Sequence, residues 1–281
     1  MQMNRIKGVF MKKKIYTLLC SSLLLSSIVS CAQDNPVALA PLHGDDESFA
    51  FTVQIENMSQ NTDLATSLAP MAWAVFAEGN MLFTPGETAN AAFESLAEDG
   101  DPEALIDGLT GALSKGHLTE PIAPGAQATF TFDAKPGSVL SFASMLVETN
   151  DVVLAPENAH LDLFDARNEP FSGTVTLKLF DAGTEVNQTP GAGADQAPRQ
   201  SAANTGTAES VAIQTVAARA DGFAYPTVGD AFRVTITAAH DDHEDHDHET
   251  EAADHDHGAE TEVHAADEDH GAAHDEEHEH G

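Results

Sequence analysis

Histidine and carboxylate side chains are densely mixed in the C-terminal residues 240–281. This segment holds 11 of the 14 histidines and 18 acidic residues, without a lysine or arginine. Such mixtures bind Zn²⁺, Ni²⁺ or Cu²⁺, and a pliable chain can arrange several of them around one ion. With little apolar surface to bury, residues 239–281 are predicted to be a disordered, metal-binding tail; a merely solubilising tail is the alternative. The expected zinc ligands are His240, His243, His246, His248, His255 and His257.

A second group of potential ligands stands at the ends of predicted strands in the middle of the chain. Asp151 follows one strand-like segment, and Asp181 and Glu185 follow another. Ca²⁺ takes six to eight oxygen ligands, and carboxylates at the mouths of neighbouring strands can supply them. Gly183 would let the loop between the two acids turn tightly. We therefore predict a calcium site made by Asp151, Asp181 and Glu185; solvated loop acids are the alternative. Weaker candidates are Glu98, Asp99 and Asn150.

The elements that must position these acids are mainly strands. Apolar residues alternate with polar ones, as at Phe49, Phe51 and Val53, which is the period of a half-buried strand. Two short helices are expected, one over residues 90–97 and one that begins at Asp101-Pro102. No βαβ alternation occurs, so the sequence predicts an all-β fold, an antiparallel β-sandwich over residues 48–238. The strand-like segments are 49–56, 71–77, 129–132, 139–147, 174–180 and 232–236. The stretch 182–208 is predicted to be a long surface loop.

The first thirty residues have the pattern of an export signal. Lysines at 12–14 precede an apolar run over 15–29 that is too short to span a bilayer. The run ends in Ile28-Val29-Ser30-Cys31, which resembles the lipobox of bacterial lipoproteins. We expect residues 1–30 to be a lipoprotein-type signal peptide that starts at Met11, with lipid on Cys31 and a tether over 31–47. An ordinary secretory signal is the alternative.

Composition narrows the function. The 281 residues include 46 acidic and 12 basic side chains, for a formal net charge of −34. This charge argues against nucleic acid as a partner, because phosphate binding needs clustered lysine and arginine. Cleavage before Cys31 would also remove Cys20, which leaves no thiol for catalysis or for a disulfide. No serine-hydrolase, phosphate-loop or zinc-protease motif occurs. We therefore expect a protein that is not an enzyme.

Six short motifs follow one another along residues 48–238: Glu56-Asn57-Met58-Ser59, Leu68-Ala69-Pro70, Ala97-Glu98-Asp99-Gly100, Ser144-Met145-Leu146-Val147, Thr149-Asn150-Asp151 and Asp181-Ala182-Gly183-Thr184-Glu185. Their order and spacing resemble the spondin N-terminal domain in its short bacterial version. The resemblance implies an eight-stranded sandwich like a C2 domain, a calcium site at one end of it, and a role in adhesion or matrix binding. The chain departs from the family pattern at residues 152–156, where an aromatic-Gly pair is usual, and lacks the cysteines of the animal domains.

Together these features predict an exported, lipid-anchored, non-catalytic monomer that uses calcium to bind extracellular matrix, a glycan or a surface protein. It would sit on the outer membrane or cell surface, facing outward or toward the periplasm, and touch the membrane through its lipid only. The alternatives are a zinc-buffering protein in which the tail is the active part, and an unrecognised hydrolase. Calcium uptake is expected to change little between about pH 7.5 and 5.5, whereas zinc uptake should fall as imidazole is protonated.

Overall fold

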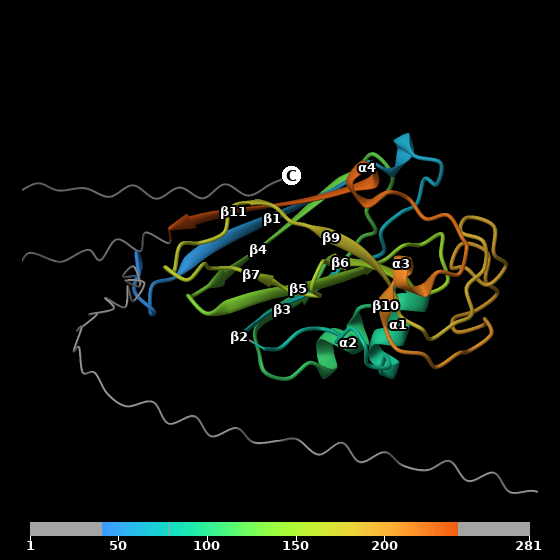
Figure 1. Ribbon diagram of the computed structural model, residues 1–281, viewed down its shortest axis with the longest axis horizontal. Coiled ribbons are helices and arrows are strands. Elements are labelled where there is room, and N and C mark those ends of the chain that lie inside the picture. The colour runs from blue at the N-terminus through green and yellow to red at the C-terminus, as the bar shows by residue number, and fades with distance from the viewer. Residues whose placement is uncertain (1–40, 78, 241–281) are drawn as a thin grey trace, which may run out of the picture. The chain divides into compact units, whose positions relative to one another are not determined.

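The computed structural model describes residues 41–77 and 79–240, which form two β-sheets (Figure 1). The smaller sheet has the strand order β4-β1-β11-β8, and the larger has the order β10-β9-β6-β5-β2-β3, with β7 paired to β5. Every strand pair with a described register is antiparallel, which confirms the all-β, antiparallel sandwich. The smaller sheet comprises β1 (Phe49–Asn57), β4 (Gln127–Ala134), β8 (Gly173–Thr174) and β11 (Phe232–His240).

The larger sheet carries most of the short strands. Its members are β2 (Ala72–Ala77), β3 (Ala112–His117), β5 (Ser138–Met145), β6 (Val152–Pro156), β7 (Leu161–Asp162), β9 (Leu177–Asp181) and β10 (Gln214–Thr215). β7, β8 and β10 have two residues each, and the other eight described strands have five or more. Eight strands of five or more residues therefore build the sandwich; β8 and β10 lie at sheet edges, whereas β7 pairs with the interior strand β5.

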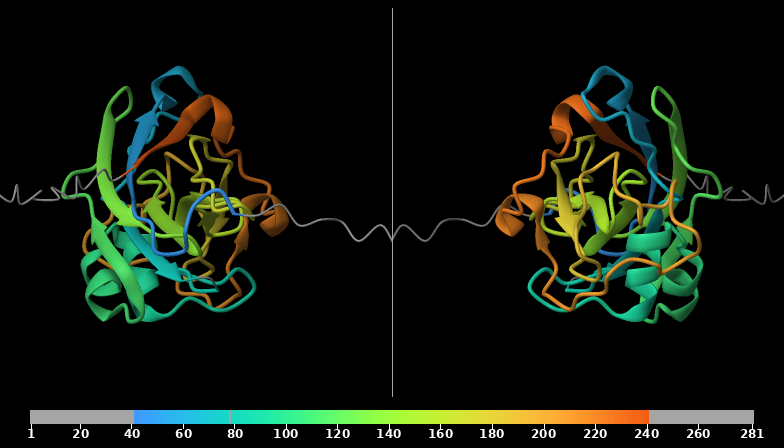
Figure 2. Two further views of the ribbon diagram at one scale, coloured as in Figure 1. Left: turned by 90° about the vertical axis from the view of Figure 1, so that its left-hand side faces the viewer. Right: turned by 90° about the vertical axis from the view of Figure 1, so that its right-hand side faces the viewer.

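Two apolar cores lie on opposite faces of the larger sheet. The first fills the space between the sheets, where Phe51 and Phe142 pack together with residues of β11. The second lies between the larger sheet and the helices α1 (Ala91–Asp99) and α2 (Glu103–Gly108). Figures 1 and 2 show these helices on the side of the larger sheet that faces away from β1 and β11. Because β5 has a core on each face, all eight of its residues are buried.

The helix termini follow local capping rules. The side chain of Asn90 accepts a hydrogen bond from the Phe93 N–H, and Gly100 ends α1 in the left-handed conformation. The second helix starts at Glu103, one residue later than the sequence suggested, and the Asp101 carboxylate accepts the Glu103 N–H at 2.9 Å, as expected of a capping residue. Beyond the two predicted helices, the described part contains a 3-10 turn, η1 (Ser59–Asn61), and two one-turn helices, α3 (Val216–Arg219) and α4 (Val228–Ala231).

The prediction of one continuous strand over residues 174–180 is wrong. The segment divides into β8 in the smaller sheet and β9 in the larger sheet. Val175 donates its N–H to Val234 of β11 at 2.9 Å, whereas the Thr176 carbonyl accepts the N–H of Glu157 at 2.9 Å. The backbone therefore changes sheets between residues 175 and 176, and β9 continues to Asp181 at the end of the sandwich.

The chain divides into two units, Met1–Ala239 and His240–Gly281. Apart from the end of β11, all the elements named above belong to the first unit. Within the described ranges, none of the helices is long and apolar enough to cross a membrane.

Candidate metal centre

Asp151 and Asp181 lie side by side because their strands are neighbours. Asp151 immediately precedes β6, Asp181 is the last residue of β9, and the antiparallel register pairs Val152 with Asp181. The backbone strengthens this junction, since the Ala182 N–H donates to the Asp151 carbonyl at 3.0 Å. The two acids do lie together at strand ends, but the strand beside β9 is β6, which the sequence analysis did not predict, and β6 separates β9 from the segment 139–147 that was expected to carry Asp151.

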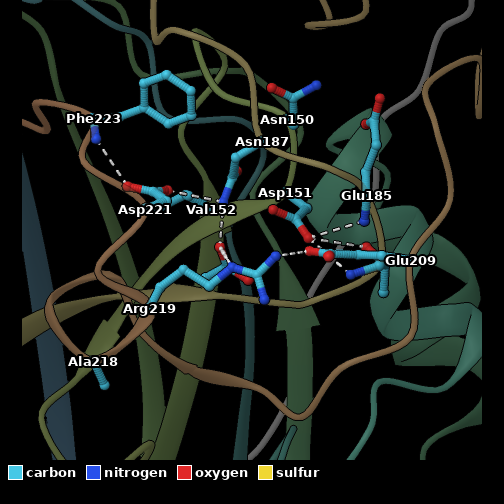
Figure 3. A network of polar contacts seen from close by, with 12 residues as sticks. Asn150, Asp151, Val152, Glu185, Asn187, Glu209, Ala218, Arg219, Asp221 and Phe223 are labelled. Atoms are coloured by element: carbon cyan, nitrogen blue, oxygen red, sulfur yellow. Dashed lines mark hydrogen bonds and ion pairs between the residues drawn. The ribbon is translucent and has the colours of Figure 1, made fainter.

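Each of the two aspartates has one oxygen engaged and one without a partner. The Asp151 Oδ2 atom accepts the backbone N–H groups of Thr184 at 2.8 Å and Glu185 at 3.2 Å (Figure 3). Its Oδ1 atom is buried and has no hydrogen-bond partner, and the same holds for Asp181 Oδ1. Both side chains are 0% exposed, so bulk solvent does not reach these oxygens. Unpaired buried carboxylate oxygens are costly and call for a proton or a cation.

The third member of the group is Glu209. One carboxylate oxygen from each of Asp151, Asp181 and Glu209 lies within 4.8 Å of the others. Glu209 comes from the returning arm of the long loop, which pairs with the outgoing arm: its N–H donates to the Thr184 carbonyl at 2.7 Å, and the Val211 N–H donates to Gly183 at 3.0 Å. Residues far apart in sequence are thus fixed together by backbone hydrogen bonds.

Gly183 makes that pairing sterically possible. It has a φ of +69°, and a Cβ atom built on it would lie 2.6 Å from both the Cγ2 and the carbonyl oxygen of Val211. The sequence expectation of a tight turn at Gly183 therefore has a geometric basis, in the left-handed backbone and in the close approach of the returning arm.

Arg219 partly neutralises the three carboxylates from one side. Its guanidinium is ion-paired with Glu209 and lies 3.5 Å from Asp181 Oδ2. Thr215 caps α3 by accepting the Ala218 N–H at 3.2 Å, and α3 directly follows β10, whose residue Gln214 pairs with Asp181. Since Arg219 contacts the Oδ2 atom of Asp181, the Oδ1 atom stays available to a second cation.

Three carboxylates against one guanidinium leave a surplus of negative charge. The pKa of Asp151 is raised to about 7, first by burial and then by the charge of Asp181. Burial also raises the pKa of Asp181, although Asn187 and Arg219 act in the opposite direction. The hydrogen bond to Glu209 raises the pKa of Arg219, which stays charged. A divalent cation would offset the surplus and remove the cost of ionising Asp151.

Glu185, the third ligand predicted from the sequence, turns its carboxylate elsewhere. Its backbone N–H donates to Asp151, but Figure 3 shows its carboxylate pointing away from Asp151 and Glu209. It packs instead against Gly206, where a Cβ atom would lie 1.1 Å from Glu185 Oε1. Burial raises the pKa of Glu185 to about 7, against the effect of the Asn150 amide, and the charge of Glu98 raises it further.

The stretch predicted to be a surface loop, residues 182–208, is irregular but firmly attached. Gln196 is 0% exposed, and Arg199 forms an ion pair with Glu148 at 2.7 Å. Asn150 Oδ1 accepts the Gln188 N–H at 2.9 Å. The loop therefore covers the acidic end of the sandwich. Long loops with their own packed side chains are frequently functional.

The remaining sequence candidates have varied positions. Asn150 orients the loop and Glu98 is buried beside Thr184, whereas Asp99 accepts hydrogen bonds from Gln200 and Asn204 of the loop. The sequence analysis did not identify Glu209 or Arg219. Basic residues are scarce in the domain, which could have drawn attention to Arg219, but no sequence signal distinguishes Glu209 from the other acids. Cys31 and the tail histidines from His243 onward lie outside the described residues, as does the side chain of His240.

No family model matches the chain, and no curated protein matches it. The chemistry of the site therefore follows from its own atoms. The three described ligands are all carboxylates, which suit hard cations such as Ca²⁺ better than the softer transition metals. The unpartnered Oδ1 atoms of Asp151 and Asp181, together with Glu209, fit a calcium ion in both charge and donor type.

Proposed function

We propose that this chain is an exported, lipid-anchored, non-catalytic protein whose β-sandwich binds Ca²⁺ and mediates adhesion or matrix binding. The observation that carries the proposal is that Asp151 and Asp181 each have a buried, unpartnered Oδ1 atom, and that one carboxylate oxygen of each residue lies within 4.8 Å of the other and of Glu209. The resemblance to the spondin N-terminal domain, carried in part by the motifs around Asp151 and Asp181, agrees with the proposal, because it implies calcium at one end of such a sandwich.

Bound calcium would act structurally in this proposal. Asp151 joins the start of β6 to the outgoing arm of the loop, Asp181 belongs to β9, and Glu209 belongs to the returning arm. An ion held by these residues would fix the loop against the strand ends and so shape the surface at that end of the sandwich. Both aspartates are fully buried, which favours this role over attack on a substrate.

Thermal unfolding of the full chain tests the calcium site. A ligand that binds only the folded state stabilises it by roughly 2.7 kcal/mol at a hundredfold excess over Kd. The melting temperature should rise with calcium relative to EDTA, and Asp181→Asn should abolish most of the rise. Asp133→Asn, which removes an exposed acid of β4, should keep it. Tail binding does not confound this shift if the tail binds equally in the folded and unfolded states.

An identical melting temperature with calcium and with EDTA would refute the calcium site. A rise that survives in Asp181→Asn would place the ion elsewhere.

A zinc-buffering protein is the second candidate, favoured by the 11 histidines of residues 240–281. Deletion of this segment distinguishes the two functions. Adhesion and the calcium-dependent rise in melting temperature should survive the deletion if the domain is the active part. If the deletion abolishes adhesion as well as zinc binding, the zinc-buffering function is favoured.

A further inference from the structure

A cleft of ≈ 680 Å³ opens near the candidate metal centre. Three segments line it: residues 61–64 at the end of η1, residues 189–190 of the long loop, and residues 224–227 together with Asp230 of α4. The same loop thus covers the acidic site and forms one wall of the cleft. A concave surface at the meeting point of separate segments is where ligands usually bind.

The charge of the cleft is negative and unbalanced. Two exposed carboxylates, Asp63 and Asp230, belong to its lining, whereas no lysine, arginine or histidine does. Neither carboxylate takes part in an ion pair with another described residue. Several bases of the domain have partners elsewhere, as with Arg199 and Glu148. The cleft therefore attracts positive groups and repels anions.

An apolar wall completes the lining. Leu64, Pro190, Tyr225 and Pro226 are all half-buried there. A ligand that suits both parts has an apolar stem and a positive head, which is the make-up of a lysine or arginine side chain. The head would pair with the carboxylates, and the aromatic ring offers a further contact for a cation.

A chain of hydrogen bonds joins this cleft to the metal centre. The Tyr225 hydroxyl donates to Asp221 Oδ2 at 2.8 Å, and Asn187 Nδ2 donates to the same oxygen at 3.1 Å. Asn187 also donates to Asp181 Oδ2, and Figure 3 shows Asn187 between Asp221 and Arg219. The position of the aromatic wall therefore depends on an aspartate of the candidate calcium site.

We propose that the cleft binds a basic side chain of a partner protein, and that calcium at Asp151, Asp181 and Glu209 strengthens this binding by fixing Asp181 and the loop. The inference rests on the proposed adhesive function and names the chemistry of its partner. A neutral glycan is the competing ligand, and the test below separates the two.

The test uses a reporter inside the cleft, because the acidic tail also attracts cations. The chain has two tyrosines, Tyr16 and Tyr225, and cleavage before Cys31 would remove Tyr16, so a tyrosine ring label in the processed protein reports on the cleft, and Tyr225→Phe confirms the assignment. The probe is a Gly–Ser peptide that carries two arginines, titrated into the full chain with calcium at about 0.15 M salt to limit non-specific attraction. The Tyr225 signal should shift, and a peptide with glutamine in place of arginine should leave it unchanged.

Two variants with the same change in net charge provide the control. Asp63→Asn with Asp230→Asn should weaken peptide binding about tenfold or more. Asp133→Asn with Glu120→Gln removes two exposed acids outside the cleft and should change the affinity less than about twofold. An equal loss in both variants would overturn the proposal in favour of general attraction to a polyanion. So would a Tyr225 shift caused equally by the glutamine peptide or by a neutral oligosaccharide such as chitohexaose.

Measurements with calcium and with EDTA separate this inference from the proposed function. Peptide affinity should be several-fold higher with calcium than with EDTA, and Asp63→Asn with Asp230→Asn should keep the calcium-dependent rise in melting temperature. If that rise occurs in the wild type but the Tyr225 signal does not move, the cleft proposal fails alone. If calcium leaves the melting temperature unchanged, the proposed function fails. Equal peptide affinity with and without calcium would overturn the link between the sites.

Discussion

The carboxylates at the end of the sandwich differ in where they point and in which groups they contact. Asp151, Asp181 and Glu185 each have one buried carboxylate oxygen without a hydrogen-bond partner, but the carboxylate of Glu185 points away from Asp151, and only its backbone N–H contacts that residue. The glutamate that completes the group is Glu209, which arrives from the far arm of the loop. Proximity in sequence to Asp181 therefore does not decide which glutamate lies within reach of both aspartates.

Replacement of the two glutamates distinguishes their roles. Glu209→Gln should remove most of the calcium-dependent rise in melting temperature, because the site loses one of three charged ligands. Glu185→Gln keeps the backbone N–H that binds Asp151 and should retain most of the rise. Differential scanning fluorimetry with calcium and with EDTA measures both. The opposite ranking would restore Glu185 as the ligand predicted from the sequence.

The raised pKa of Asp151 predicts how stability depends on pH without calcium. The carboxyl has a pKa of about 7 in the folded state, against an ordinary value of 3.8. Between these values the folded state binds more protons than the unfolded state, so the free energy of unfolding falls as the pH rises. Above pH 7, the ionisation of Asp151 lowers the free energy of unfolding by roughly 4 kcal/mol at most. Urea titrations with EDTA at about pH 5 and pH 8 should show this fall, and Asp151→Asn should reduce it.

Above pH 7, bound calcium should restore part of the free energy of unfolding that the ionisation of Asp151 removes. Below pH 7, protons should compete with calcium for this carboxylate. The sequence expectation that calcium uptake hardly changes between about pH 7.5 and 5.5 rested on the ordinary pKa of carboxylates. Burial of Asp151 removes that basis, and calcium affinity is now expected to fall across this range. An affinity that stays constant would contradict the raised pKa.

Among the elements, the turn at Gly183 determines whether the loop can close on the strand ends. Gly183→Ala should destabilise the fold by about 2 kcal/mol or more, because it adds left-handed strain to a clash with the Val211 backbone. Gly86→Ala is the matched control: Gly86 has a φ of +93° and open space around its Cβ position, so only the strain of about 1 kcal/mol should appear. Urea titrations of the two variants measure the difference. Equal losses would mean that the approach of Val211 is not restrictive.

How far the sequence predicts these elements depends on how local their causes are. β1 alternates cleanly because one face is buried, and β2 and β5 appear as apolar runs because both faces are buried. β3 lacks such a pattern, with Leu113 exposed at the sheet edge, and it was not predicted. The change of sheets after Val175 and the positions of Glu209 and Arg219 depend on backbone pairing between distant segments, which periodicity does not reveal.

At the scale of the whole molecule, the acidic tail and the domain should differ in the metal that they bind. Zinc ligands in a flexible segment must be deprotonated, and free imidazole titrates near pH 6.5. Zinc uptake by a peptide of residues 240–281 should therefore fall steeply between about pH 7.5 and 5.5. Isothermal titration at both pH values measures it. Unchanged uptake at the lower pH would show that carboxylates, rather than the 11 histidines, are the ligands.

The placement of Asp151, Asp181 and Glu209 on three separate segments also bears on how the molecule matures. An ion held by all three would clasp points of the chain about thirty residues apart, as a cross-link does, in a protein whose only cysteines are Cys20 and Cys31. Unlike a disulfide, this clasp is set by the surrounding calcium rather than by redox poise. If the protein is exported as proposed, it leaves a cytosol poor in calcium, so the ion would add its cross-link to the backbone hydrogen bonds of the loop only outside the cell.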